Sequence, residues 1–246
     1  MEKRKIGIGY ENYKEFVDQD MYYIDKTLLI RDILAQGGKV TLFTRPRRFG
    51  KTLALSMLRT FFEAEIDLDG KPVNNSRYFE GKKIMDCGGE VLSRMGKYPV
   101  IKLSLKSAKQ PDFSTAFSKL REDIIFEFMR HAYLLDSEKL DPTEKERMRD
   151  ILSGDLTWEK LQNSLKNKRE REGAFVKEVG RYATALKTLS IFLKKHHGQN
   201  VIVLLDEYDV PLEMPGSPAF TSRWLPSSAR FSSLSLRPMT RWSLRW

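Results

Sequence analysis

Three consecutive residues, Gly50-Lys51-Thr52, are of the types that bind a phosphate chain. In a tight loop that leads into a helix, backbone N–H groups converge on an anion, and glycine permits its close approach. Lys51 could then reach the outer phosphates, and the hydroxyl of Thr52 could bind Mg²⁺. The full pattern G-x-x-x-x-G-K-[ST] has glycine at position 45, where this chain has Arg45. A basic surface turn that caps a helix is therefore the alternative interpretation.

Two carboxylates, Asp206 and Glu207, follow the apolar run Val201–Leu205. Ligands of open α/β sheets bind at the carboxyl ends of the strands. There Asp206 would hold Mg²⁺ through water, and Glu207 would polarise the water that attacks a γ-phosphate. Tyr208 and Asp209 are weaker candidates. Alone, the two carboxylates could be a solvated strand end, but together with the phosphate motif they predict a nucleotide site.

The phosphate motif lies where a strand is expected to give way to a helix. Lys39–Thr44 is rich in β-branched and aromatic residues, and Pro46 and Gly50 then break that pattern. From Lys51 onward, apolar residues recur every three or four positions, as one face of a helix requires. These residues are Leu53, Met57, Leu58, Phe61 and Phe62. The order predicts a strand, a loop and a helix that packs on a sheet.

The same alternation of strand and helix continues along the chain. A strand is expected at Pro99–Leu105 and a helix over Phe113–Leu135. One side of that helix carries Phe117, Leu120, Ile124, Phe128 and Met129. A helical insertion is expected over Asp136–Gly173, and an amphipathic helix over Gly180–Lys195. The fully apolar run Val201–Leu205 is typical of a central strand in a parallel sheet.

Two helices are expected before the first strand. A short helix precedes the stretch Met21–Thr27, and a second helix covers Leu28–Ala35 and is closed by Gly37. Strands that alternate with helices indicate an α/β fold. We therefore expect a P-loop NTPase-like parallel sheet, flanked by helices and carrying a helical insertion.

The composition narrows the class of protein. The longest purely aliphatic run, Val201–Leu205, has five residues, against about 20 for a membrane-spanning helix. We therefore expect no membrane crossing. The single cysteine, Cys87, allows neither an intrachain disulfide nor a cysteine-based zinc site, which fits a reducing cytoplasm. The histidines His131, His196 and His197 lack partners at metal-ligand spacing, so no metal beyond Mg²⁺ is expected.

The positive charge is concentrated at the carboxyl end. The net charge is +10, and Met214–Trp246 contributes five arginines without a lysine or an acidic residue. The same segment holds eight serines, four prolines and three tryptophans, and it has no helical or strand period. The net charge alone is therefore weak evidence for a nucleic-acid partner.

Three segments together resemble the bacterial AAA-ATPase-like family. They are Tyr22–Thr27 (YYIDKT), Thr44–Thr52 (TRPRRFGKT) and Leu204–Glu213 (LLDEYDVPLE), and the resemblance runs from about Ile6 to Glu213. It implies a P-loop NTPase domain in which arginine replaces the first glycine of the phosphate loop. Members of this family commonly carry a further domain that resembles PD-(D/E)XK nucleases, and their physiological role is largely unassigned.

Carried over by position, the resemblance implies a site for ATP and Mg²⁺. Gly50, Lys51 and Thr52 correspond to the Walker A phosphate loop, which Phe49 precedes. Asp206 and Glu207 correspond to the metal-binding and water-activating carboxylates of Walker B. Arg47 and Arg48 could add phosphate contacts, and two solvated arginines are an equally good interpretation. Tyr22, Tyr23 and Asp25 could approach the nucleotide base or pack against the first strand.

We expect a partial NTPase domain over residues 1–213 and an aberrant, disordered tail over residues 214–246. A shift of the reading frame after Glu213 would explain the tail, and a natural Ser/Arg-rich tail is the alternative. In either case the strands that follow Walker B in such domains would be missing. The predicted function is Mg²⁺-dependent ATP binding, with hydrolysis in doubt. The alternatives are a non-hydrolysing module that recognises nucleic acid or protein, and an inactive fragment.

Overall fold

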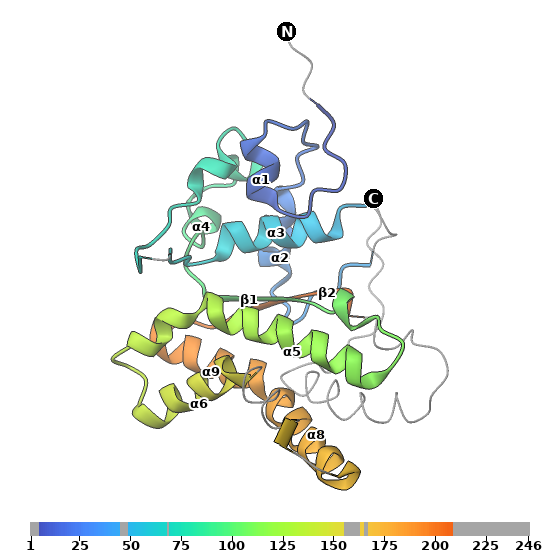
Figure 1. Ribbon diagram of the computed structural model, residues 1–246. Coiled ribbons are helices and arrows are strands. Elements are labelled where there is room, and N and C mark those ends of the chain that lie inside the picture. The colour runs from blue at the N-terminus through green and yellow to red at the C-terminus, as the bar shows by residue number, and fades with distance from the viewer. Residues whose placement is uncertain (1–4, 45–48, 68, 155–162, 165–166, 209–246) are drawn as a thin grey trace.

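Two parallel strands lie between two layers of helices in the computed structural model, which describes residues 5–44, 49–67, 69–154, 163–164 and 167–208 (Figure 1). Strand β1 spans Val100–Ser104 and strand β2 spans Ile202–Asp206. Val100 lies opposite Ile202, and Ser104 lies opposite Asp206. Because the strands are parallel, Ser104 and Asp206 end at the same edge of the sheet.

One face of the sheet is covered by helix α3, which spans Lys51–Phe62. Side chains alternate between the two faces of a strand, so Val100, Ile202 and Leu204 all point toward this helix. The helix packs against these residues with a buried apolar stripe that includes Phe61. The remaining members of the stripe are Leu55, Met57, Leu58 and Phe62. This packing holds the first turn of α3 beside the end of β2.

Short elements complete the layer around α3 (Figure 1). They are α1 (Tyr13–Asp18), α2 (Leu28–Gln36), the 3₁₀ helices η1 (Ser76–Phe79) and η2 (Lys83–Asp86), and α4 (Gly89–Leu92). Tyr13, Phe79 and Ile84 are fully buried and anchor α1, η1 and η2 to the core. Helix α2 ends at Gly37, whose φ of 60° is a left-handed conformation that glycine adopts without strain.

The opposite face of the sheet is covered by longer helices (Figure 1). These are α5 (Phe113–Arg130), α6 (Pro142–Leu152), α8 (Lys168–Ala183) and α9 (Ala185–His197), with η3 (Lys106–Ala108) and η4 (Ala132–Asp136) between them. Ile101 and Leu103 of β1 pack into this second core. Helix α6 begins with a reciprocal capping box between Asp141 and Glu144, which satisfies backbone N–H groups that a helix start leaves free.

The α/β layering predicted from the sequence is confirmed, but one expected strand is absent. Residues 39–44 form no strand, and Val40 and Leu42 are 45% and 61% exposed. Within the described residues the sheet has only β1 and β2, and residues 39–44 pair with neither strand. Strand β2 therefore has an open edge, where a central strand was expected, and its Val203 is 49% exposed.

Two helix boundaries also differ from the prediction. Helix α5 ends at Arg130 and the chain tightens into η4, so Met129 is 55% exposed although it was assigned to the buried face. The helix expected over Gly180–Lys195 is two helices, α8 and α9, which meet at Thr184. The expected boundary at Glu213 and the tail after it lie outside the described residues.

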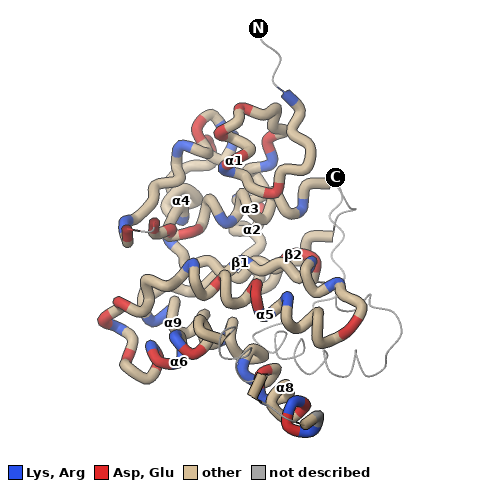
Figure 2. Tube along the Cα trace, viewed as in Figure 1, with Lys and Arg blue, Asp and Glu red and all other residues tan. Residues whose placement is uncertain are grey.

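The described surface carries charges of both signs. Figure 2 shows lysine and arginine interspersed with aspartate and glutamate along α6 and α8. No helix among the described residues combines the length and the apolar character that a membrane crossing requires.

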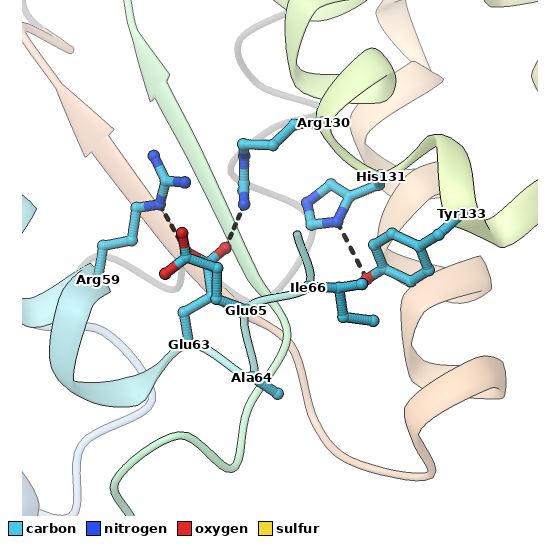
Figure 3. A pocket seen from close by; sticks show the side chains of 8 residues that line it. All are labelled: Arg59, Glu63, Ala64, Glu65, Ile66, Arg130, His131 and Tyr133. Atoms are coloured by element: carbon cyan, nitrogen blue, oxygen red, sulfur yellow. Dashed lines mark hydrogen bonds and ion pairs between the residues drawn. The ribbon is translucent and has the colours of Figure 1, made fainter. Parts of the chain in front are cut away.

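A buried knot of three charged side chains, Arg130, Glu63 and Glu127, links α3, α5 and β1, and Figure 3 shows its Arg130–Glu63 pair. Arg130 of α5 pairs with Glu63, which follows α3, and with Glu127 one turn away. Arg130 Nη2 also donates to the carbonyl oxygen of Val100 at 2.5 Å, and Glu127 Oε1 accepts from the backbone N–H of Lys102 at 2.9 Å. The side chains of α5 thus take the place of a neighbouring strand along this edge of β1. Burial alone would raise the pKa of Glu127, but the neighbouring His131 and the hydrogen bonds from Arg130 outweigh it and hold the pKa at about 2.

Removing the central cation of this knot should destabilise the fold strongly. In Arg130→Met, Glu127 remains buried without its arginine partner and Glu63 keeps only its ion pair with Arg59, which costs about 3 kcal/mol. The measurement is the free energy of unfolding in urea. Lys119→Met, on the same helix, removes an exposed ion pair with Glu122 and should leave that free energy nearly unchanged. Equal losses in the two variants would contradict the role of the knot.

Candidate functional site

The start of α3 and the end of β2 meet through a side-chain hydrogen bond. Thr52, in the first turn of α3, donates its hydroxyl to Oδ2 of Asp206, the last residue of β2, at 2.7 Å. The two residues are 154 positions apart in the chain. Asp206 is 5% exposed, so this hydroxyl takes the place of water around the carboxylate. The two sequence motifs therefore form one site.

The backbone before α3 has the conformation that an anion site requires. Gly50 is the N-cap of α3, with φ of 73° in the left-handed region, and no side chain caps the helix. The first N–H groups of a helix have no partner within it and carry a partial positive charge. Among the described residues outside its immediate neighbours, Lys26 Nζ is the heavy atom within 4 Å of the point where a β-carbon on Gly50 would stand, at 3.9 Å. A cationic group thus lies beside the turn that precedes these N–H groups.

The Asp206 carboxylate is held at both oxygens. While Oδ2 accepts from Thr52, Oδ1 accepts from the backbone N–H of Glu207 at 3.0 Å. Glu207 has φ of 52°, a left-handed conformation that is uncommon for residues other than glycine. Strain of this kind costs about 1–3 kcal/mol and is concentrated at functional sites. The turn at Glu207 thus directs the chain away from β2 immediately after the buried carboxylate.

A lysine that the motifs did not indicate lies on the same face of the sheet as Asp206. Lys102 is on β1, and the pleat places it toward α3 together with Val100 and Ser104. Burial lowers the pKa of the Lys102 ammonium group, and the nearby Arg59 lowers it further, while Asp206 opposes the change. No sequence pattern distinguishes a half-buried lysine in a strand from an exposed one. Only the structure therefore reveals the position of Lys102.

Two of the other residues expected at the site are exposed, and three lie outside the described residues. Phe49 is 59% exposed and Tyr208 is 44% exposed, so neither is enclosed by the described residues. Arg47, Arg48 and Asp209 lie outside the described residues.

The residues named as possible neighbours of the base have local roles. The Tyr23 hydroxyl donates to Met57 Sδ of α3 at 3.2 Å, and Asp25 accepts hydrogen bonds from Thr27 and from the backbone of Lys83. Tyr22 is 58% exposed. Of the two roles weighed for Tyr23, it therefore has a packing role, although its partner is a helix and not a strand.

The oxygen atoms of Thr52 and Asp206, where α3 meets β2, are of the kinds that Mg²⁺ prefers as ligands. A threonine hydroxyl and a carboxylate are hard oxygen ligands, and Mg²⁺ in proteins usually keeps water and phosphate oxygens in its other positions. Thr52 and Asp206 could therefore hold the ion together with a bound phosphate chain. Among the described residues, no group of three or more His, Cys, Asp or Glu side chains is arranged to hold a metal.

A separate small cavity lies at the opposite end of α3 (Figure 3). Its space is about 40 Å³, room for a few water molecules at most and far too small for a nucleotide. Its wall includes Glu63 and Arg130 of the buried knot together with His131 and Tyr133. The Tyr133 hydroxyl lies 3.2 Å from His131 Nδ1 and 2.9 Å from His197 Nε2. These histidines serve packing between α5, η4 and α9.

Comparisons with known proteins show which family the chain resembles. The model of the family described as Predicted AAA-ATPase matches residues 7–217, which include both motifs. The Uncharacterized protein in vnfD 5'region of Azotobacter chroococcum mcd 1 is 29% identical over 123 residues. That alignment covers 50% of this chain and 21% of the relative, so the chain spans about a fifth of the relative's length. No solved structure matches the chain.

Loss of the Thr52 hydroxyl should leave the buried carboxylate without its partner. We expect Thr52→Val to lower the free energy of unfolding by about 1–3 kcal/mol, because an unsatisfied buried acceptor is costly. The measurement is urea unfolding at neutral pH. Thr115→Val is the matched control, since the Thr115 hydroxyl also bonds an aspartate, Asp112, but at an exposed helix start. If both variants unfold at the same urea concentration, the Thr52–Asp206 bond does not hold the junction.

Proposed function

Since the chain belongs to the AAA-ATPase-like family, we propose that it binds ATP with Mg²⁺ where α3 meets β2. The observation that carries this proposal is the hydrogen bond of 2.7 Å between Thr52 Oγ1 and Asp206 Oδ2. It supports the proposal because it joins a phosphate-type loop to a carboxylate at a strand end, where α/β proteins bind ligands.

Each residue has a distinct task in the proposed complex. The N–H groups that follow Gly50 would donate to phosphate oxygens, and the Lys51 ammonium would neutralise the outer phosphates. Thr52 and Asp206 would hold Mg²⁺, which when bound offsets charge on the phosphate oxygens. These tasks need only atoms that already lie at one corner of the molecule.

Hydrolysis is the second part of the proposal. Glu207 directly follows Asp206, and its carboxylate would orient a water molecule toward the terminal phosphate. The left-handed backbone at Glu207 supports this role, because such strain persists where the surrounding structure enforces it. A module that binds nucleotide without turnover would use the same phosphate contacts and would not need Glu207.

Nucleotide affinity should depend on the Lys51 ammonium. We expect Lys51→Ala to weaken binding of a fluorescent ATP analogue about 10- to 100-fold, because a charge-assisted hydrogen bond contributes about 1.5–3 kcal/mol. The measurement is an equilibrium fluorescence titration in the presence of Mg²⁺. Lys187→Ala, at an exposed position of α9 in the opposite layer, is the control and should bind as the unaltered chain does. Equal affinities for Lys51→Ala and the control would refute the assigned site.

Hydrolysis and binding should separate at Glu207. We expect Glu207→Gln to keep the ATP affinity within about threefold while phosphate release falls at least about 100-fold, as loss of a general base implies. The measurement is a phosphate-release assay run beside the titration. If the unaltered chain binds ATP and releases no phosphate, the binding module is the correct reading. If Glu207→Gln hydrolyses ATP at the unaltered rate, another group orients the water.

A further inference from the structure

Lys26 brings a second ammonium group to the phosphate motif from a distant part of the chain. Its Nζ lies 3.9 Å from the point where a β-carbon on Gly50 would stand. Lys26 belongs to the segment Tyr22–Thr27, which lies outside both motifs described above. The juxtaposition places Lys26 beside the left-handed turn that opens the N-terminus of α3.

The backbone on both sides of Lys26 is fixed by hydrogen bonds. Asp25 Oδ1 accepts from the backbone N–H and the hydroxyl of Thr27 at 2.8 and 2.6 Å, and Asp25 Oδ2 accepts from the backbone N–H of Lys83 at 2.8 Å. Thr27 is fully buried, and its hydroxyl accepts from the backbone N–H of Ile84 at 3.2 Å. Asp25 and Thr27 therefore fix the backbone of this segment. The side chain of Lys26, between them, extends toward Gly50.

The unit that carries Lys26 is docked on α3 itself. The Tyr23 hydroxyl donates to Met57 Sδ at 3.2 Å, and the backbone N–H of Tyr13 donates to Ser56 Oγ at 2.9 Å. The rings of Tyr13 and Tyr23 pack edge to face, with centroids 5.5 Å apart. Lys26 thus keeps its place relative to the helix that begins with the phosphate motif.

The charges around this point are unbalanced. Lys26, Lys51 and the N-terminus of α3 all contribute positive potential, and none of the described ion pairs engages either lysine. The nearest carboxylate in sequence, Asp25, is occupied by its own hydrogen bonds, and Asp206 is occupied by Thr52 and Glu207. Asp25 and Asp206 keep their negative charges but are already engaged by these hydrogen bonds, so an anion that enters beside Lys26 and Lys51 gains the attraction of both ammonium groups.

We propose that Lys26 is a second phosphate-binding cation of the nucleotide site, acting beside Lys51 on the same phosphate chain. This inference rests on the proposed function. It assigns the segment Tyr22–Thr27 a division of labour, in which Asp25 and Thr27 fasten the segment and Lys26 contacts the ligand. The predicted specificity is for di- and triphosphates over the nucleoside, because the contact is to phosphate.

The test compares Lys26→Met with Lys82→Met in the full chain. Lys82 Nζ lies 5.5 Å above the Tyr23 ring in the same unit, and it is not placed at the phosphate motif. Fluorescent analogues of ATP, ADP and adenosine are titrated with Mg²⁺ present, and circular dichroism verifies folding. We expect Lys26→Met to weaken ATP and ADP binding about tenfold and to leave adenosine binding within about twofold. Lys82→Met should match the unaltered chain, and Lys26→Arg should recover most of the affinity.

The outcomes separate the failure of this inference from failure of the proposed function. If the unaltered chain binds none of the three analogues, both the proposed function and the role of Lys26 are wrong. If it binds ATP and Lys26→Met binds equally well, Lys26 makes no phosphate contact. If Lys26→Met loses ATP and adenosine to the same degree, or Lys26→Arg fails to recover affinity while folded, Lys26 only supports the loop.

Discussion

The hydrogen bond between Thr52 and Asp206 joins two parts of the chain that are 154 residues apart, and the candidate site depends on it. Formation of the bond requires the first turn of α3 to lie over the end of β2. The parallel pairing of β1 with β2 and the packing of Phe61 against the α3 face of the sheet provide that placement. A buried carboxylate without this hydroxyl would be costly, so the same contact that assembles the site also stabilises the fold.

The layer around α3 and the layer around α5 are joined at the other end of α3 by the charged knot of Arg130, Glu63 and Glu127. This arrangement anchors α3 at both ends, through Thr52 at its start and Glu63 just after its last turn. A helix anchored at both ends keeps its N–H groups in a constant position relative to β2. Preorganisation of this kind lowers the cost of ordering a site when a ligand binds.

Much of the fold was predictable because local patterns determine it. The apolar spacing of α3 and α5 and the glycine after α2 indicate helices and their ends directly, and the order of motifs predicts their meeting. The strand expected at residues 39–44 is wrong because β-branched and aromatic residues favour a strand without determining its pairing, and this segment pairs with neither β1 nor β2. Lys26 and Lys102 could not be placed from sequence, since their positions near Gly50 and Asp206 result from docking between distant segments.

The central claim is that Asp206 belongs to a Mg²⁺-dependent nucleotide site, and calorimetric titration of ATP with and without Mg²⁺ tests it most directly. Asp206→Asn keeps the size of the side chain and removes the charge that a metal requires. The account predicts that Mg²⁺ strengthens ATP binding to the unaltered chain at least about tenfold, equivalent to about 1.4 kcal/mol, and that Asp206→Asn loses this gain. An equal effect of Mg²⁺ on both chains would contradict the account.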